Sequence, residues 1–237
     1  MYGGYYYGFD GTYLLVLIGA VICMIASANV KSTFNKFAQQ RSMTGMTGAQ
    51  AAQRILNHAG IYDVTIQHIS GQLTDNYNPG KKTLNLSDAV YGAASVAAIG
   101  VAAHECGHAI QHQQGYAPLN IRSAIVPAAN IGSKLAWPLI LIGLFITSDT
   151  GILFINIGII AFSLAVIFQL VTLPVEFNAS RRALSLLESC GILSASELPA
   201  TKKVLTAAAL TYVASAASGI LQLLRLVLLT NNRRRRD

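Results

Sequence analysis

The chain has 237 residues, of which 53% are hydrophobic and only 11% are charged, and its formal net charge is +7. This charged fraction is less than half of the ~25% that is usual in soluble domains. Composition therefore excludes an ordinary soluble protein and predicts an α-helical integral membrane protein. A basic chain can bind nucleic acid, but the arginine run 233–236 beside apolar helices is more typical of an anchor at anionic lipid headgroups. We expect a lipid bilayer as a partner and no nucleic acid.

The first predicted element is an N-terminal membrane anchor within residues 1–30. Residues 11–30 carry no charge over 20 positions, which is long enough for a helix to cross a bilayer. Ala26-Ser27-Ala28 resembles the end of a secretory signal. However, the leading segment MYGGYYYGFD contains no Lys or Arg, whereas a signal peptide has a positive start. We therefore expect the anchor to be retained.

Residues 31–134 are more polar and are predicted to form a small folded α+β domain. One helix is expected after the capping-box pattern of Thr47 and Gln50. Three short runs follow and predict a short antiparallel sheet, and their sequences are VTIQHIS, QLTDNY and KTLNLS. A second, alanine-rich helical region is expected from Ser87 to Gly115.

This second helical region contains His104-Glu105-Cys106-Gly107-His108, an HExxH motif. Residues four apart lie one above the other on a helix, so His104 and His108 can bind one zinc ion. Glu105 follows the first histidine and can reach a metal-bound water as general base. The alternative is a core helix with incidental histidines. That alternative is disfavoured because burying an acid and two histidines together is costly unless they are paired or bind a metal.

A third metal ligand is expected downstream. His112 continues the same helix face, but it lies two turns beyond the first histidine, so we expect it at the surface or behind the ligands. Among the later acids, Glu176 is favoured because it follows the longest apolar run directly, on the same side of the membrane as the motif. Pro174 predicts that a new helix begins there. An acid that only stabilises this helix start is the alternative for Glu176, and Glu188 and Glu197 are the remaining choices.

A transmembrane helical hairpin is predicted over residues 135–173, with Ser148 to Thr150 as the turn. Residues 174–203 are then expected to form the third-ligand helix. This helix would complete a zincin-like catalytic domain whose main part is the α+β segment of residues 31–134. Positive residues flank the anchor and the hairpin on the side of the motif. The positive-inside rule therefore places the N-terminus outside and the site in the cytoplasm.

Residues 204–237 are predicted to form a C-terminal apolar helix with a basic tail. If this helix crossed the membrane, its four terminal arginines would lie outside, against the positive-inside rule. Arg225 also interrupts the apolar run, where a charge at membrane depth is costly. We therefore expect a helix that packs along the domain and dips into the membrane, with its arginine end at the cytoplasmic headgroups.

Several stretches together resemble the YugP-like membrane zinc metallopeptidases, from about Val30 to Arg225: KSTFNKF, GQLTDNYNP, AAIGVAAHECGHAIQH, GYAPLNIRSAIVPAANIG, FQLVTLPVEFNASRRAL and AALTYVA. The resemblance implies a bacterial integral-membrane zinc metallopeptidase. The order of elements also resembles the HtpX-type gluzincins, which place a membrane hairpin between the HExxH helix and a ligand glutamate. This implies metal roles for His104, His108 and Glu176 and the general-base role for Glu105.

The chain departs from these families near the third ligand. In the YugP-like family an acid often stands where this chain has Asn178, and HtpX-type enzymes often carry an Asp where it has Ser180. The expected carboxylate behind a ligand histidine is therefore replaced, so Asn178, Ser180 or a backbone carbonyl must orient the imidazoles.

The function predicted from these features is a zinc-dependent endopeptidase in the bacterial inner (cytoplasmic) membrane, with about one Zn²⁺ per chain. Its expected substrates are peptides or membrane proteins, which could add to an edge strand such as Thr83–Leu86. Tyr212, Arg181 and His68 are equal candidates for stabilising the oxyanion. The alternative function is a non-catalytic zinc-binding scaffold or sensor. A transporter is disfavoured because the anchor and the longest span contain no charge.

Overall fold

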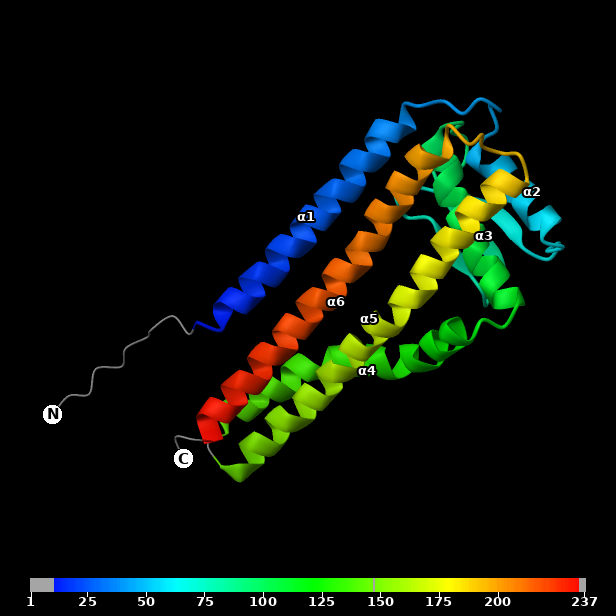
Figure 1. Ribbon diagram of the computed structural model, residues 1–237. Coiled ribbons are helices and arrows are strands. Elements are labelled where there is room, and N and C mark those ends of the chain that lie inside the picture. The colour runs from blue at the N-terminus through cyan, green and yellow to red at the C-terminus, as the bar shows by residue number, and fades with distance from the viewer. Residues whose placement is uncertain (1–10, 147, 235–237) are drawn as a thin grey trace. The chain divides into compact units, whose positions relative to one another are not determined.

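A computed structural model of the chain describes residues 11–146 and 148–234 (Figure 1). Within this range the element order is α1 (Tyr13–Ala38), α2 (Gly48–His58), β1 (Thr65–Ile69), β2 (Asn76–Asn78), β3 (Thr83–Ser87), α3 (Val96–Gln113), α4 (Ala117–Phe145), α5 (Asp149–Ser189) and α6 (Leu198–Arg234). The four longest helices, α1, α4, α5 and α6, are long and apolar enough to cross a membrane. The predicted class, a mainly helical chain with apolar spans and a small sheet, is confirmed to this extent.

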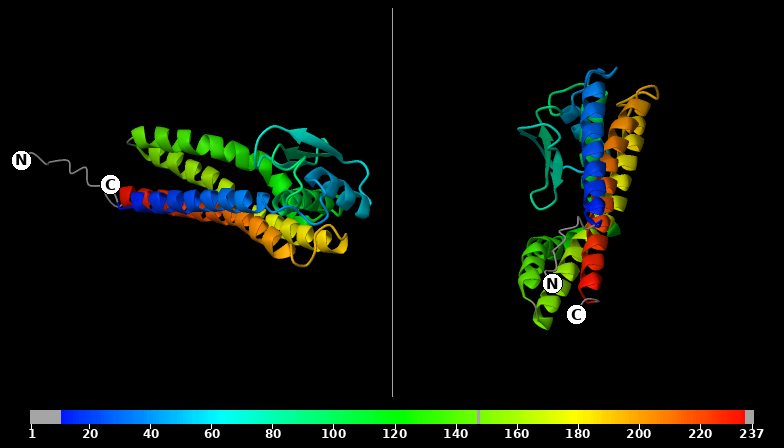
Figure 2. Two further views of the ribbon diagram at one scale, coloured as in Figure 1. Left: turned by 90° about the horizontal axis from the view of Figure 1, so that it is seen from above. Right: turned by 90° about the vertical axis from the view of Figure 1, so that its left-hand side faces the viewer.

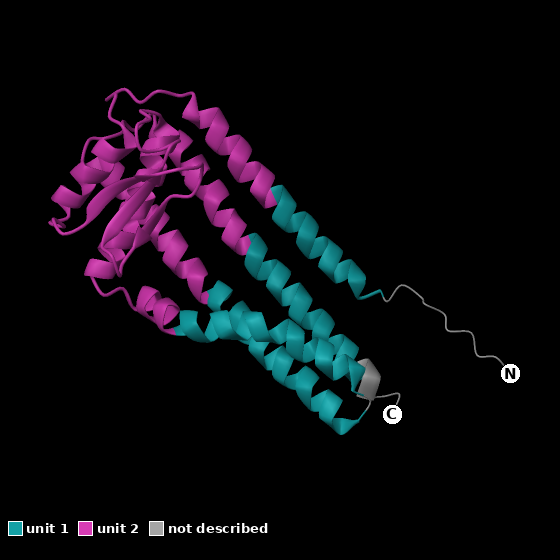
Figure 3. Ribbon diagram, turned by 180° about the vertical axis from the view of Figure 1, so that it is seen from behind, with its two compact units in different colours: residues 1–25, 125–170, 214–237 teal, residues 26–124, 171–213 magenta. Residues whose placement is uncertain are grey.

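The chain divides into two units (Figure 3). Unit 1 comprises residues 1–25, 125–170 and 214–237, and unit 2 comprises residues 26–124 and 171–213. The described part of unit 1 is built from segments of the four long helices, whereas α2, α3 and the sheet belong to unit 2.

Small residues let the helices of unit 1 pack closely. A Cβ atom at Gly132 would lie 2.5 Å from the carbonyl oxygen of Ala161, and one at Gly158 would lie 2.9 Å from that of Ala136. These approaches hold α4 and α5 side by side as an antiparallel pair, and the predicted hairpin falls on these two helices. Lipid tails are as apolar as leucine, so close contact through small residues is what associates helices in a bilayer.

Helix α6 runs antiparallel to α1 within unit 1. The Sγ atom of Cys23 donates to the carbonyl oxygen of Ala214 at 3.6 Å, and the guanidinium carbon of Arg225 lies 4.2 Å from the ring centroid of Tyr13. Helix α6 therefore accompanies α1 along this segment, whereas the sequence predicted a helix that only dips into the membrane. The aromatic contact lowers the cost that Arg225 was expected to impose.

Unit 2 has its own hydrophobic core. Its largest fully buried apolar side chains come from α1, α2, β3, α3, α5 and the α5–α6 loop, and they are Phe34, Ile55, Leu56, Leu84, Leu86, Ile99, Leu187 and Ile192. Helix α2 begins with the predicted capping box, in which Thr47 and Gln50 each accept the other's backbone N–H. This core fixes α3, which carries the HExxH motif, against the sheet and α2.

The three-stranded sheet of unit 2 differs from the predicted antiparallel one (Figure 2). Its order is β1-β3-β2, with β3 parallel to β1 and antiparallel to β2. Strand β3 takes the centre because Leu84 and Leu86 are fully buried, whereas most of β1 is exposed. The predicted substrate-binding edge at Thr83–Leu86 is therefore wrong, since that strand is paired on both sides, and the outer strands are β1 and β2.

Two predicted helix starts are also wrong. Helix α3 begins at Val96 rather than Ser87, because Ser87 ends β3 and the Asp88 carboxylate accepts from the backbone N–H of Gly71 at 2.8 Å instead of capping a helix. Helix α5 continues through Pro174 without a new start. A proline removes one helical hydrogen bond, and long apolar helices tolerate this loss when neighbouring groups compensate.

Candidate metal centre

Helix α3 brings the HExxH motif close to α5. Its N-cap is Ser95, whose hydroxyl accepts from the backbone N–H of Ala98 at 3.1 Å. Gly107 lies inside the motif, where a Cβ atom would be 2.7 Å from the carbonyl oxygen of Ala179 on α5. Only a residue without a side chain permits this approach of the two backbones. The approach places Glu176, one turn before Ala179, beside the histidines of α3.

The structure gathers His104, His108 and Glu176, with their ligand atoms all within 4.8 Å of one another. The Oε2 atom of Glu176 lies 3.2 Å from Nε2 of His104 and 3.5 Å from Nε2 of His108. The two imidazoles are nearly perpendicular, with ring centroids 4.8 Å apart. The histidine side chains are 13% and 12% exposed and the Glu176 side chain 2%, so the cluster is almost shielded from solvent.

These donor atoms suit zinc. At bond lengths of about 2.0–2.1 Å in a tetrahedral shell, neighbouring ligand atoms lie about 3.3–3.4 Å apart. Both nitrogen-to-oxygen distances are close to this separation. Two imidazoles and a carboxylate are also the donor set of catalytic zinc sites, which leave a fourth position for water or substrate.

The tautomer of His108 is fixed by Gln111, which the sequence had not suggested as part of the site. The Nε2 atom of Gln111 donates to Val175 O and to Asn178 Oδ1, each at 2.9 Å. Its Oε1 atom must therefore accept the proton of His108 Nδ1, which lies 3.0 Å away. His108 Nε2 then faces the oxygen of Glu176, and this close contact is satisfied either by a proton on Nε2 or by a metal ion held between the two atoms.

His104 is held by a different partner. Its Nδ1 atom lies 3.1 Å from Oγ of Ser180 on α5. Ser180 and, through Gln111, Asn178 thus take the place of the acids expected behind ligand histidines. Both had been named as candidates for that role. Arg182 donates from Nε to the same Asn178 oxygen at 2.7 Å, which extends the network toward the surface.

A cavity of about 230 Å³ opens beside the cluster within unit 2. Glu105 and His104 line it together with Tyr212 of α6, and Asp75 contributes a second carboxylate. Glu105 is buried, which raises its pKa above the usual value, while the two histidines act in the opposite direction. Apolar side chains form the rest of the wall, among them Leu73, Val101 and Leu205.

Tyr212 and Arg122 both interact with Glu176. The Nη1 atom of Arg122 lies 3.7 Å from Oε1 of Glu176, the oxygen that does not face the histidines. The sequence had given Tyr212 as one of three oxyanion candidates and had not suggested Arg122. A charged residue just past the HExxH helix, on the predicted cytoplasmic side, was the available signal for Arg122.

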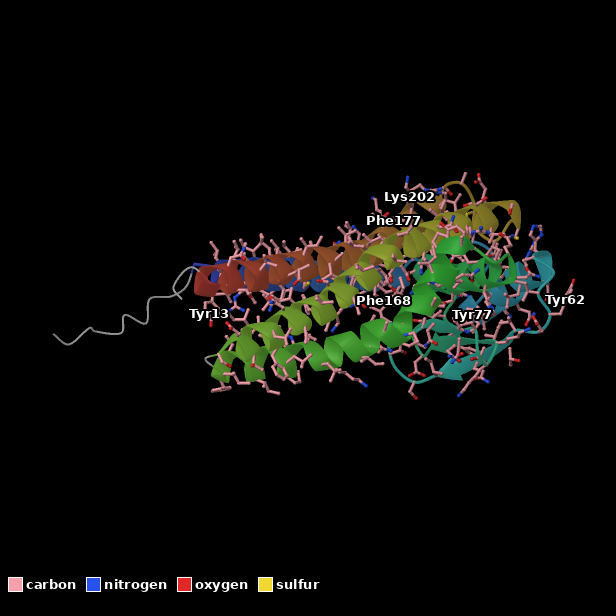
Figure 4. The ribbon with its side chains drawn as sticks, turned by 90° about the horizontal axis from the view of Figure 1, so that it is seen from below. Tyr13, Tyr62, Tyr77, Phe168, Phe177 and Lys202 are labelled. Atoms are coloured by element: carbon pink, nitrogen blue, oxygen red, sulfur yellow. The ribbon has the colours of Figure 1, made fainter. Side chains whose placement is uncertain are left out.

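The other candidates lie elsewhere. Glu188 is exposed, and Glu197 accepts from Met43 N and from Ser194 instead of facing the histidines. His112 shares a 2.9 Å hydrogen bond with the hydroxyl of Tyr77, which is labelled in Figure 4. His68 is paired with Asp88 at 2.7 Å and stacks on Tyr91, and Arg181 is exposed. Of the three oxyanion candidates, Tyr212 is the one that lines the cavity with Glu105.

Fold and site together describe a chain of apolar helices that carries a His–His–Glu centre. The sequence profile of a family described as "Putative neutral zinc metallopeptidase" matches residues 12–231, and the chain belongs to this family. A relative from Bacillus subtilis (strain 168), "Putative membrane protease YugP", is 46% identical over 209 residues, which cover 88% of this chain and 92% of the relative. No solved structure matches the chain.

Proposed function

We propose that the protein is a membrane-embedded zinc endopeptidase whose metal is held by His104, His108 and Glu176, at about one ion per chain. The observation that carries this proposal is the convergence of three ligand atoms at the edge of a cavity that Glu105 also lines. A structural zinc site usually fills all four positions with Cys or His. Three ligands beside an acid and a cavity favour catalysis over the scaffold or sensor alternative.

Each residue has a distinct role in the proposed reaction. Zinc bound at this centre would act as a Lewis acid and lower the pKa of a water molecule toward neutrality. Glu105 accepts a proton from the attacking water and afterwards gives it to the leaving amine. The hydroxyl of Tyr212 donates a hydrogen bond to the oxyanion that develops on the scissile carbonyl. Arg122, Gln111 and Ser180 hold the three ligand side chains in place.

The proposed substrate is an extended peptide segment with an apolar side chain beside the scissile bond. Leu73 lines the cavity from the β1–β2 loop and has a positive φ of 58°, a conformation that is unfavourable for a leucine. The loop is tied on both sides, because Asp88 accepts from Gly71 N and Asp75 accepts from Ser87 N. A peptide can add its backbone to the outer strand β2 and place a side chain against Leu73.

Replacing the proposed base tests the function. We expect Glu105→Gln to keep zinc but to lose about 10²–10⁴-fold in the rate of hydrolysis, because an amide cannot accept the water's proton. Zinc is measured by elemental analysis of the detergent-purified protein, and hydrolysis with a casein-type or membrane-protein substrate.

Glu188→Gln removes an exposed carboxylate outside the site and serves as the matched control. Cleavage by Glu105→Gln at the wild-type rate would show that Glu105 is not the base. A wild-type protein that binds zinc and cleaves nothing would favour the scaffold or sensor instead.

A further inference from the structure

A second cavity lies among the helices of unit 1, with a volume of about 330 Å³. Its walls come from α1, α4, α5 and α6 and are mainly apolar, with Ile140, Leu144, Ile155 and Leu229 among the lining residues. One charged residue, Arg225 of α6, also lines it. We call this space the Arg225 cavity. An arginine on the wall of an apolar cavity requires a partner, because apolar walls do not compensate for the hydration that its charge loses.

The described residues stabilise the charge of Arg225 only in part. The guanidinium of Arg225 stacks on Tyr13, which is labelled in Figure 4 at the start of α1, and the buried Nε atom has no hydrogen-bond partner among the described residues. Lys134 and Asp149 are the other charged side chains of unit 1 within residues 11–146 and 148–231. Within residues 11–146 and 148–231, no carboxylate lies within 4.0 Å of the Arg225 guanidinium. The positive charge is therefore stabilised by an aromatic ring and not by an anion of these segments.

The position of Arg225 along its helix indicates the kind of anion that fits. Asn231 lies six positions further along the helix, which is about 9 Å. Tyr13 at the first turn of α1 and Leu144 at the last turn of α4 line the same cavity, so it lies at the end of unit 1 where these helices begin and end. This is the depth at which aromatic residues and lipid headgroups meet in a bilayer.

We propose that the Arg225 cavity binds an anionic phospholipid. The planar guanidinium has paired N–H donors that match two phosphate oxygens, and the apolar walls take the upper part of an acyl chain. A net negative lipid is favoured over phosphatidylcholine because choline neutralises the phosphate of the latter. This site is separate from the proposed metal centre and does not depend on peptidase activity.

Trp137 makes the proposal directly measurable. It is the single tryptophan of the chain and lines the Arg225 cavity. Bromine atoms on an acyl chain quench tryptophan fluorescence on contact. The purified full-length protein is therefore reconstituted with dibrominated phosphatidylglycerol or dibrominated phosphatidylcholine, each diluted stepwise with unbrominated phosphatidylcholine. We expect phosphatidylglycerol to bind about tenfold more strongly than phosphatidylcholine, as one charge-assisted hydrogen bond allows.

Three variants separate this site from general charge effects. Arg225→Gln should abolish the preference for phosphatidylglycerol, and Arg225→Lys should keep a reduced preference, since lysine retains the charge without the paired donors. Lys134→Gln removes another positive charge of this unit from an exposed position that does not line the cavity, and should behave as wild type. If Arg225→Gln fails to fold, the test relies on Arg225→Lys, in which a weakened preference for phosphatidylglycerol would support the proposal and an unchanged preference would contradict it.

Equal quenching of the wild type by both lipids would overturn the proposal, as would an unchanged preference in Arg225→Gln. Loss of the preference in Lys134→Gln would show that the preference depends on the general positive charge of the unit, and this result would also overturn the proposal. If inorganic phosphate alone, at millimolar concentration, removed the preference, the guanidinium would be a free-anion site and the lipid would be the wrong ligand.

Discussion

At the scale of single residues, the proposed metal centre combines candidate ligands from two helices with partners that fix their orientation. His104 and His108 come from α3 and Glu176 from α5, and each ligand side chain contacts a further polar residue. Replacing any one of the three by alanine leaves two ligands. We expect zinc affinity to fall by more than the ~10–100-fold that loss of an orienting partner causes. Zinc per chain, measured after dialysis against a weak chelator, checks this prediction.

Glu188→Ala and Glu197→Ala are the controls for these three substitutions. Glu188 is exposed and should have no effect. Glu197 is buried and accepts from Met43 N and Ser194 N, each at 2.8 Å, so its loss should lower thermal stability while zinc is retained. Equal loss of zinc in the Glu176 and Glu197 variants would reject the assignment of the third ligand.

Tyr212 is expected to affect the rate of hydrolysis much more than zinc binding. Removing one donor to an oxyanion costs about 10²–10³ in kcat, so Tyr212→Phe should lower kcat by this factor with little change in KM. Zinc affinity should fall far less than in the alanine variants of the three proposed ligands, because the phenol contacts Glu176 but is not itself a ligand. A Tyr212→Phe protein with wild-type kcat, or one that loses its zinc, would contradict this role.

The sequence was sufficient for part of this site. The i, i+4 spacing of His104 and His108 follows from helical geometry alone, and Glu176 could be selected because few acids follow the motif. The role of Gln111 could not be predicted, because it depends on Val175 and Asn178, which belong to a helix that is distant in sequence. The available signal was local: a polar residue three positions after His108, about one turn along the same helix.

At the scale of elements, the alanine-rich character of α3 is explained by the helices that pack on it. A Cβ atom at Gly100 would meet the Cγ2 atom of Thr201 on α6 at 2.5 Å, and one at Gly107 would meet the backbone of Ala179 on α5. Small residues on α3 therefore bring two other helices close enough to place Glu176 and Tyr212 near the motif. In α3, small residues therefore permit close contact with neighbouring helices, while the histidines of the HExxH motif provide the proposed metal ligands.

Gly107→Ala tests this contact. The added Cβ would lie 2.7 Å from Ala179 O and 3.1 Å from Ala179 Cα, so α5 must move because both atoms belong to the backbone. We expect a loss of about 1–3 kcal/mol in stability and weaker zinc binding, since Glu176 moves with α5. Thermal unfolding and zinc titration measure the two effects.

Gly92→Ala is the matched control, because a Cβ atom there meets nothing within 4 Å. It should leave both stability and zinc affinity near the wild-type values. A Gly107→Ala protein that bound zinc as the wild type does would show that the close approach of α3 and α5 is not needed for the centre.

The errors at the element scale share one cause. The strand runs were recognisable from their residues, but the central position of β3 and its parallel pairing with β1 depend on which strand is buried in the complete core. The helix break expected at Pro174 was likewise a local rule, and it was overridden where an apolar helix continues on both sides. Local sequence predicted the existence of these elements better than their partners or their ends.

At the scale of the whole molecule, the arrangement of α1 and α6 bears on membrane topology. Their antiparallel contact extends from Cys23 and Ala214 to Tyr13 and Arg225. These contacts cover about 15 Å of α1, which is half of a bilayer core. Because α6 is also long and apolar enough to cross, we expect it to cross together with α1. The chain then has four spans, and its C-terminus lies on the same side as its N-terminus, although this exposes the arginine run 233–236 on that side.

Positive charge still favours a cytoplasmic catalytic unit. Lys31, Lys36, Arg181 and Arg182 follow the apolar runs of α1 and α5 on the side of the motif, where charges close to a span have the greatest influence on orientation. The terminal arginines are translocated last and compete against all of these. The predicted orientation is therefore a metal centre in the cytoplasm, with both termini outside.

Two single-cysteine proteins test this topology, in a chain whose Cys23, Cys106 and Cys190 have been replaced. Asp237→Cys should react with a membrane-impermeant maleimide on intact cells, because α6 is expected to cross completely. Tyr62→Cys, at a position of unit 2 that is 80% exposed, should react only after the membrane is permeabilised. Labelling of Tyr62→Cys from outside would show that unit 2 lies outside the cell and that the predicted orientation is wrong. Protection of both positions until permeabilisation would mean that α6 does not cross, and that the antiparallel contact with α1 does not extend through the bilayer.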